Sequence, residues 1–173
     1  NLVTGSLSGS PLGAVFQKGL SAISVQDFAA YAPSGGVPAG FVSAPVYAGG
    51  DVEGVVALQL PLEAINTIMQ QRDGMGETGE SYLIGFDMKM RTDSFLDPVG
   101  HSVNASFAGT VANNGVDTEG ARLAIAGNTD TKIIIDYNGN PVLSSFAPLS
   151  LNGLEWAILS EIDEAEALIP AKA

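Results

Sequence analysis

The sequence predicts an α+β fold that is built on antiparallel β-sheet. In some stretches apolar residues recur at helical spacing, and in others they form short runs rich in β-branched residues. Strong turn signals join neighbouring runs, above all Asn138-Gly139 and Asn152-Gly153. Because tight turns can join only antiparallel strands, whereas parallel strands need long crossovers, we expect hairpins rather than a parallel sheet.

The composition is that of a globular chain. Its 173 residues suit one large domain or two small modules. Hydrophobic residues make up 46% and charged residues 15%, which is enough apolar material for a core. The absence of cysteine excludes thiol catalysis, thiolate metal sites and disulfides, but it does not fix the compartment.

The charge excludes two classes of partner. The net charge is −12, with only seven Lys and Arg, so the chain has almost nothing with which to neutralise phosphates. We therefore expect no nucleic acid and no attachment to an anionic lipid surface. No apolar run approaches the roughly 18 residues that span a bilayer, and no signal peptide is recognisable. Neither Asn1 nor Ala173 reads like a natural terminus, so we expect a piece of a longer polypeptide.

Helix and strand patterns alternate along the first third of the chain. Pro11 suits a first helical turn, and we expect a helix over about 11–22. Strands are predicted at 25–31, 39–47 and 52–60, and the last two are joined by a glycine-rich turn at 48–51. Pro45 lacks a backbone N–H, so it is expected at a bulge or at a sheet edge.

The rest of the chain continues with the same kinds of element. Pro61 begins a helix that ends near Gly74, and a glycine-rich loop, 74–79, follows. We expect a helix from Asp117 or Thr118 to about 126, a long connection over 95–116 with one short helix, and a further helix from Asp163. The predicted strands are 81–85, 89–94, 132–137, 141–148 and 154–162.

The order of elements indicates two related modules. Residues 1–60 contain a helix and three strands, which is also how the second part of the chain ends. We therefore predict that 1–60 is the late part of a first module, and that 61–169 is a complete module with an exit helix.

Several motifs resemble the Cache family, the extracytoplasmic relatives of PAS domains in bacterial receptors. The resemblance covers nearly the whole chain and is strongest over 74–167. Within that part it rests on segments 74–85, 90–94, 116–120, 136–149 and 161–167, and upstream on 27–34 and 41–45. It implies a PAS-like antiparallel five-stranded sheet with flanking helices in 61–169, preceded by a partial second module of the same kind.

The resemblance also implies a function. Such domains are periplasmic parts of inner-membrane receptors: chemotaxis receptors of the methyl-accepting kind first, then sensor histidine kinases and cyclases. It implies a small-molecule ligand, a homodimer in the full receptor, and membrane attachment only through flanking helices outside this sequence. Many members bind amino acids or carboxylates. Trp156 is the only tryptophan, however, and no arginine stands two residues before it, so the Arg-x-Trp motif of some amino-acid receptors is absent.

Two sequence features that resemble functional motifs have a simpler structural interpretation. The spacing of Gly74, Gly76 and Gly79 matches a dinucleotide fingerprint, but that fingerprint needs a strand before it and a helix after it. Here the predicted order is reversed, so we interpret the segment as a turn between modules. His101 is the only histidine and lies in a polar stretch. Without Gly-x-Ser-x-Gly or a second metal ligand we interpret it as a loop residue.

The acidic group Asp163, Glu164 and Glu166 offers oxygens that a divalent cation uses. At this spacing a solvated face, or a favourable interaction with a helix N-terminus, is the better interpretation. No cofactor and no metal are predicted.

Arg91 is the leading candidate for a ligand-binding residue. An arginine inside a predicted strand is conspicuous in a chain with so few basic residues, and its fork can bind a carboxylate through two hydrogen bonds. The alternative is an ion pair with Asp93 or another carboxylate. Neighbouring predicted strands carry the other candidates, of which strand alternation places only some in a pocket. The predicted ligand-binding residues are Tyr82, Arg91, Asp93, Asp136, Tyr137, Ser145 and Phe146.

Two functional hypotheses follow, and neither is enzymatic, because no nucleophile and base are found together. In the first, a ligand enters a cavity between the sheet and the connection 95–127 and shifts a conformational equilibrium that the exit helix transmits. In the second, the chain is a protein-interaction or dimerisation ectodomain of a histidine kinase or cyclase without its own ligand. A pocket filled by the domain's own side chains, beside a large exposed apolar patch, would favour the second.

Overall fold

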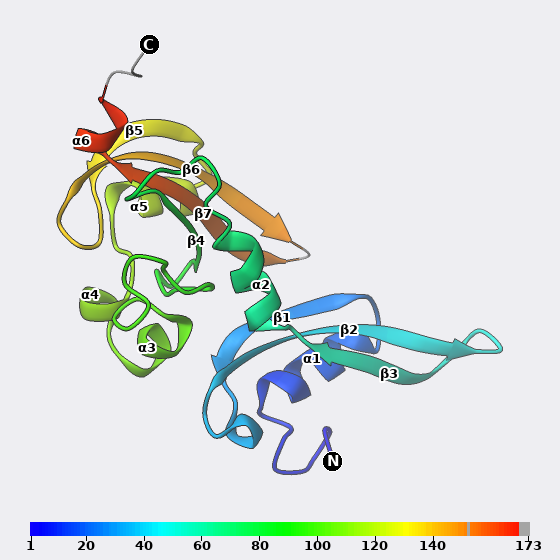
Figure 1. The fold of residues 1–173 in the computed structure, drawn as a ribbon. Coiled ribbons are helices and arrows are strands. Elements are labelled where there is room, and N and C mark those ends of the chain that lie inside the picture. The colour runs from blue at the N-terminus through cyan, green and yellow to red at the C-terminus, as the bar shows by residue number, and fades with distance from the viewer. Residues whose placement is uncertain (152, 170–173) are drawn as a thin grey trace. The chain divides into compact units, whose positions relative to one another are not determined.

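The computed structural model describes residues 1–151 and 153–169, and it divides them into two compact units (Figure 1). The first unit comprises Asn1–Pro61 with a short piece near residue 154, and the second comprises Leu62–Ser150 with the residues from Glu155 onward. Each unit holds helices and one antiparallel sheet, so the predicted α+β class is confirmed. Among the described residues, no helix is long and apolar enough to cross a membrane.

The first unit is one helix on a three-stranded sheet of order β1-β2-β3. Its elements are α1 (Pro11–Gly19), β1 (Ser24–Ala30), the 3-10 turn η1 (Ala32–Ser34), β2 (Pro38–Ala48) and β3 (Asp51–Gln59). Ser10 caps α1 by accepting a hydrogen bond from the Gly13 amide at 3.2 Å, and Pro11 occupies the first turn. Pro45 lies beyond Ser43, where the pairing of β2 with β1 ends, so its missing N–H costs no ladder bond there.

The core of the first unit lies between α1 and the sheet. Val15 meets Phe41, whose ring contacts that of Tyr31 edge to face at 5.1 Å between centroids. The helix comes close to β2, because a Cβ on Gly19 would lie only 2.5 Å from the Ser43 hydroxyl. That buried hydroxyl donates to the Val15 carbonyl at 2.8 Å, so the close approach is also hydrogen-bonded.

The second unit is a four-stranded antiparallel sheet of order β4-β7-β6-β5 with short helices around it. The strands are β4 (Glu80–Gly85), β5 (Asp130–Ile135), β6 (Pro141–Leu151) and β7 (Leu154–Asp163). The helices are α2 (Leu62–Met69), α3 (Val103–Ala108), α4 (Val111–Asn114), α5 (Glu119–Ile125) and α6 (Glu164–Ala167).

The fifth strand expected in this sheet is reduced to a single bridge between Ile84 and Met90. The segment 89–94 does run beside β4, but side chains take over part of the ladder. The Leu83 amide donates to the Thr92 hydroxyl at 2.9 Å, and the Met90 amide donates to the Ser106 hydroxyl at 3.0 Å. The prediction of a regular strand was wrong because threonine and serine offer the backbone an alternative partner.

Other boundaries also differ from the predictions. The helix expected over 11–22 ends at Gly19, and the strand expected over 132–137 ends at Ile135, which leaves Asp136 and Tyr137 in the turn that follows. The connection 95–116 contains two short helices rather than one.

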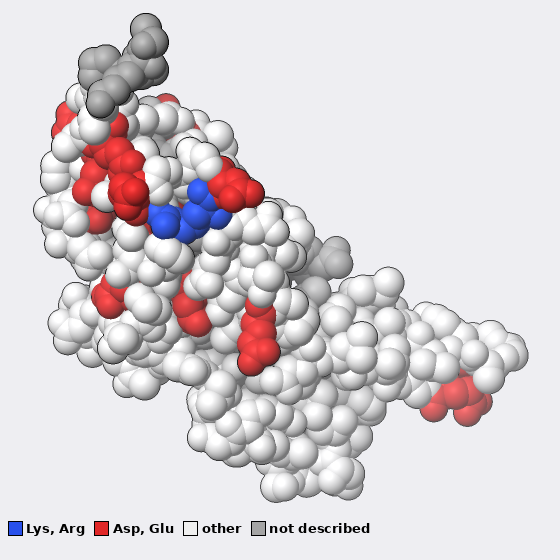
Figure 2. All heavy atoms as spheres, viewed as in Figure 1, with Lys and Arg blue, Asp and Glu red and all other residues white. Residues whose placement is uncertain are grey.

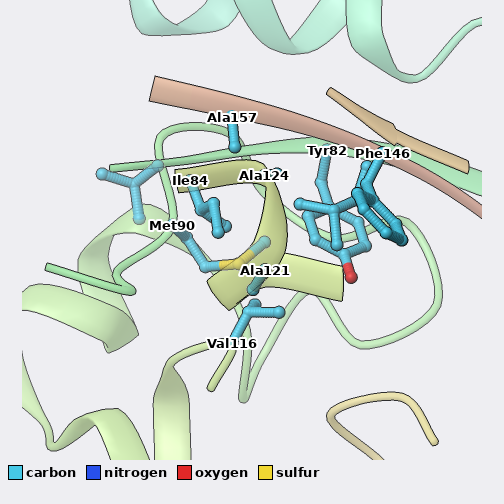
Figure 3. Packing of buried hydrophobic residues seen from close by; sticks show 10 residues of the cluster. Tyr82, Ile84, Met90, Val116, Ala121, Ala124, Phe146 and Ala157 are labelled. Carbon is cyan, nitrogen blue, oxygen red and sulfur yellow. The ribbon is translucent and has the colours of Figure 1, made fainter. Parts of the chain in front are cut away.

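One face of the second sheet carries the core of the unit (Figure 3). Alternation along β4 turns Tyr82 and Ile84 inward, and α5 covers them with Ala121 and Ala124. The helix lies close against the sheet, because a Cβ on Gly120 would come within 3.0 Å of the Phe146 ring. Beside α5 and the preceding connection, a cavity opens near the end of β5.

Candidate ligand-binding site

A cavity of about 510 Å³ opens where α4 and the start of α5 face the end of β5. Its volume falls within the range typical of small-molecule sites. It lies between the sheet and the connection 95–127, where the sequence predicts a ligand. We call it the acidic cavity. Its lining residues are Val111, Ala112, Gly115, Asp117, Thr118, Glu119, Ile135, Asp136 and Tyr137.

Local structure fixes the walls of the acidic cavity. The Asp136 carboxylate closes the turn after β5 by accepting hydrogen bonds from the amides of Asn138 at 2.8 Å and Asn140 at 2.7 Å. On the opposite wall, the Thr118 hydroxyl caps α5 by accepting from the Ala121 amide at 3.2 Å. Both walls are therefore preformed, which lowers the entropy that a ligand must lose on binding.

Among the described residues, the cavity is lined by three carboxylates and by no lysine or arginine. Two of them have basic neighbours behind the wall. Arg122 lies 2.7 Å from Asp117 and lowers the pKa of that carboxyl through a hydrogen bond, and Lys132 pairs with Glu119. Asp136 has no ion-pair partner among the described residues. Most of the face shown in Figure 2 is uncharged, and among its charged side chains the acidic ones cover more area than the basic ones, in keeping with 19 Asp and Glu against seven Lys and Arg.

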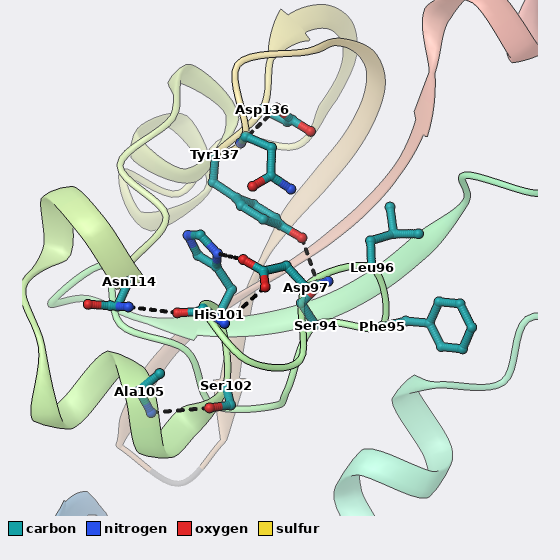
Figure 4. A network of polar contacts seen from close by, with 12 residues as sticks. Ser94, Phe95, Leu96, Asp97, His101, Ser102, Ala105, Asn114, Asp136 and Tyr137 are labelled. Carbon is teal, nitrogen blue, oxygen red and sulfur yellow. Dashed lines mark hydrogen bonds and ion pairs between the residues drawn. The ribbon is translucent and has the colours of Figure 1, made fainter.

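A buried polar network backs the cavity through Tyr137 (Figure 4). The Tyr137 hydroxyl donates to Glu80 and also lies 2.8 Å from the Ser94 hydroxyl. The His101 ring packs against the Tyr137 ring with 4.1 Å between centroids and a tilt of 37°, and its Nδ1 lies 2.7 Å from Asp97 Oδ2. Burial and the charge of Glu80 raise the pKa of Tyr137 well above its usual value, so the phenol stays protonated.

Glu80 is the centre of this network. Its side chain is only 3% exposed, and one of its carboxylate oxygens accepts from the Ser94 hydroxyl at 2.8 Å and from the amides of Phe95 at 2.9 Å and Leu96 at 3.3 Å. The other oxygen accepts from Tyr137. Such a carboxylate fixes the start of the connection 95–116 on the sheet, because four donors depend on it.

His101 lies in a loop, as the sequence indicates, but it is 93% buried rather than solvated. Its hydrogen bond with Asp97 is the largest influence that lowers the pKa of that carboxyl. The available signal was the spacing of four residues between an acid and the only histidine, immediately before a serine that caps a helix.

Two of the seven predicted ligand-binding residues, Asp136 and Tyr137, line the acidic cavity. Arg91 does not: its guanidinium lies 2.9 Å from Asp87, and it donates to the Lys89 carbonyl at 2.9 Å. It is 1% exposed and packs beneath Gly85, where a Cβ would lie 2.1 Å from its Nη2. The ion-pair interpretation of Arg91 thus agrees with the geometry, with Asp87 in place of Asp93.

The remaining candidates lie in three different environments. Asp93 links α2 to α3, because it accepts hydrogen bonds from the Asn66 side chain at 2.8 Å and from the Val103 amide at 2.7 Å. Tyr82 and Phe146 belong to the core. Ser145 is exposed on the opposite face of the sheet, where it helps to line a smaller cavity of about 250 Å³. For these residues a role in binding stays a prediction.

Glu161 is a buried acid that the sequence analysis missed. It is the cross-strand partner of Glu80, is 4% exposed, and accepts a hydrogen bond from the Tyr82 hydroxyl at 2.6 Å. Ser144 lies near enough to favour its charged form, yet neither Glu161 Oε1 nor Ser144 Oγ makes a hydrogen bond of good geometry within the described residues. Burial outweighs these contacts and raises the pKa of Glu161.

This raised pKa predicts how stability depends on pH. As the pH rises above the ordinary value of 4.5, the unfolded chain loses the Glu161 proton before the folded protein does. The stability that Glu161 contributes is therefore complete below about 4.5 and is lost as the pH rises through its folded-state pKa. Glu161→Gln stays neutral at every pH, so its free energy of unfolding should rise relative to that of the wild type as the pH increases above about 4.5.

Urea unfolding at several pH values measures this difference. Groups whose pKa is lowered, such as Asp97 and Asp117, act in both proteins and cancel in the comparison. Glu155→Gln, at an exposed position of the same strand, serves as the control and should follow the wild type. A difference between wild type and Glu161→Gln that stays constant with pH would show that Glu161 titrates normally.

The comparisons with known proteins define a class through the fold. No protein-family model matches the sequence, and no curated protein matches it either. Solved structures with this fold are ligand-binding domains of bacterial chemoreceptors, so the resemblance predicted from the sequence is confirmed at the level of the fold.

Three of these structures illustrate the likeness. The ligand-binding domain of the Pseudomonas aeruginosa amino acid chemoreceptor PctB, in complex with L-Arg, has a TM-score of 0.59 at 19% identity, over 91% of this chain and 62% of that one. The Pseudomonas fluorescens chemoreceptor CtaA domain with L-leucine has a TM-score of 0.55 at 16% identity, over 89% and 60%. The periplasmic sensory domain of the Campylobacter jejuni chemoreceptor Tlp1 has a TM-score of 0.65 at 17% identity, over 92% and 57%. This chain thus spans less than two thirds of each of them.

Proposed function

We propose that this chain is part of the extracytoplasmic ligand-sensing region of a transmembrane chemoreceptor, and that its ligand binds in the acidic cavity. The observation that carries the proposal is the cavity itself, which is preformed and ligand-sized and is backed by a buried network rather than filled by core side chains. The fold shared with chemoreceptor sensor domains supports the same assignment. No catalytic group is needed for such a function.

The chemistry of the walls favours a ligand with an amino group. Asp136 offers a carboxylate that has no basic partner in the part of the chain that the structure describes, and Thr118 and Tyr137 line the same cavity. A ligand carboxylate would find no lysine or arginine in this lining, so it would have to point toward solvent. An amine or an amino acid held mainly through its ammonium group fits this pattern.

Signalling would follow from a shift between two conformations. A ligand that binds one conformation tenfold more tightly biases the equilibrium by about 1.4 kcal/mol. The cavity wall at Tyr137 is connected to β4 through Glu80, and β4 pairs with β7, which leads into α6. A change at the cavity thus has a short route to α6 through hydrogen bonds and the backbone of β7.

A thermal-shift screen with primary amines, amino acids, organic acids and purines tests the proposal. At least one amine-bearing compound should raise the Tm in a saturable way. Asp136→Asn keeps an acceptor for the turn but removes the charge, so it should weaken binding by about ten- to a hundredfold. Asp130→Asn, at the exposed start of β5, is the matched control and should bind normally. A wild type that no compound stabilises, or two variants that respond alike, would refute the proposal.

A second candidate is an interaction or dimerisation ectodomain of a histidine kinase or cyclase. It is favoured by the first unit, where one face of the sheet exposes apolar side chains: Val46 at 47%, Val56 at 49% and Leu58 at 63%. We also propose that this unit is the late part of a module of the same kind as the second. Sedimentation of the wild type and of Leu58→Glu separates the candidates, because only an interaction surface makes association depend on this residue.

A further inference from the structure

The glycine-rich loop 74–79 binds a carboxylate of its own chain. Glu166 Oε1 accepts a hydrogen bond from the Glu77 amide at 2.7 Å, and Oε2 accepts from the Thr78 amide at 2.8 Å and from its hydroxyl at 2.5 Å. The same hydroxyl accepts from the Asp163 amide at 3.0 Å. Successive backbone amides around an anion form the kind of nest that other proteins use for phosphates. Here the loop holds Asp163, which precedes α6, and Glu166 within it.

The loop has the shape that this contact requires. Gly76 has φ +68°, and a Cβ there would lie 2.0 Å from Glu166 Oε1, so only glycine lets the carboxylate approach. Arg72 fixes the loop from the other side by donating to the carbonyls of Gly79 at 2.7 Å, Gly76 at 3.1 Å and Glu77 at 2.6 Å. Of the three glycines whose spacing resembles a dinucleotide fingerprint, Gly76 is therefore explained by a carboxylate in the same chain, and Gly79 by the nearby Met75 carbonyl, 2.0 Å from where its Cβ would lie.

The contact between the loop and Glu166 lies outside the core cluster of the second unit, beside an open space. The smaller cavity of about 250 Å³ lies between this loop and the outer face of the sheet, lined by Gly74, Met75 and Gly79 on one side and by residues such as Leu143 and Ile162 on the other. The loop is thus held by hydrogen bonds over a partly open space rather than by dense packing. Segments of this kind open at low free-energy cost.

We propose that the loop 74–79 and Glu166 form a latch that fixes α6 to the second unit, and that opening of this latch carries a conformational change in the unit to the residues after β7. The latch stands on its own contacts, whereas its use in signalling rests on the proposed sensor function. Thr78 and Glu166 are its positioning residues: neither touches the acidic cavity. Hydrogen bonds from Thr78 and the loop amides lower the pKa of Glu166, so the latch carries its charge at neutral pH.

Hydrogen exchange of the unliganded protein tests the latch directly. Glu166→Gln should speed exchange at the Glu77 and Thr78 amides about tenfold, because a charged acceptor is replaced by a weaker one. Exchange at the Leu168 amide, which donates to the Glu164 carbonyl at 3.0 Å, should rise with it. The amides of β4 and β7 that pair within the sheet should keep their wild-type rates.

Glu164→Gln is the matched control, because it removes the same charge from the same short helix without touching the loop. Thr78→Val gives a second route to the open state, and Thr78→Ser, which restores the hydroxyl, should return wild-type exchange. Unchanged exchange in both Glu166→Gln and Thr78→Val would overturn the latch. Faster exchange in Glu164→Gln of equal size would also overturn it, because the effect would then be general to the helix.

The proposal that a ligand binds in the acidic cavity and the proposal of the latch can be refuted independently of each other. If the screen yields no ligand but Glu166→Gln loosens the loop, the latch stands and the proposed function falls. If a ligand binds and the latch variants exchange like the wild type, the sensor function stands, and the conformational change is transmitted through contacts other than the latch.

Discussion

Glu80→Ala is expected to lower the free energy of unfolding by about 3–5 kcal/mol, the largest loss we predict for a single polar residue here. The carboxylate is 3% exposed and accepts from Tyr137, Ser94 and the amides of Phe95 and Leu96. Alanine would leave these donors in a buried space that it cannot fill. Each buried donor without a partner costs about 1–3 kcal/mol, although water that enters the space recovers a part.

Urea unfolding followed by tyrosine and tryptophan fluorescence measures this loss. Glu155→Ala, an exposed glutamate of β7, is the control and should change stability by less than about 0.5 kcal/mol. A loss below about 1 kcal/mol for Glu80→Ala would mean that the four donors find other partners, and that the network does not fix the wall of the acidic cavity.

Phe146→Ala is expected to cost about 3–5 kcal/mol through the cavity that it creates. The ring is 1% exposed and lies in the cluster with Tyr82 and Leu159. The backbone of α5 already lies close to the ring, since a Cβ on Gly120 would come within 3.0 Å of it, so the helix has little room to move into the space. Phe146→Leu keeps most of the volume and should lose much less.

Ser145→Ala is the matched control for Phe146, because the two neighbours were equal candidates for the ligand site and point to opposite faces of β6. Its stability should stay within about 0.5 kcal/mol of the wild type. In the thermal-shift screen, Phe146→Leu should keep the ligand response of the wild type. A stable Phe146→Leu that no longer responds to ligand would contradict the assignment of this ring to the core.

Much of the fold was predictable because its signals are local. The turn at Asn138-Gly139 and the alternation along β6 need only neighbouring residues, and both are found where expected. The strand over 89–94 was not predictable in the same way. Its pattern is that of a strand, but Thr92 and Ser106 take up backbone hydrogen bonds, and Ser106 comes from α3, which sequence patterns do not place beside it.

The candidate site was predictable in part for the same reason. Asp136 and Tyr137 directly follow a recognisable strand, so their place at the end of the sheet could be inferred. The opposite wall with Thr118 depends on how α5 lies against the sheet, which the close approach at Gly120 determines. A ligand-binding role for Arg91 stays a prediction: its ion-pair partner, Asp87, lies in the tight turn four residues earlier, and a charge count does not show that pairing.

The central claim is that the acidic cavity binds the ligand and that binding changes the conformation at the end of β7. Hydrogen exchange with and without the primary amine or amino acid that gives the largest Tm shift tests both halves at once. The account predicts slower exchange at residues 115–119 and 136–140, together with a change at the Glu77 and Thr78 amides. Slower exchange confined to the first unit, or to the outer face of the second sheet, would contradict it.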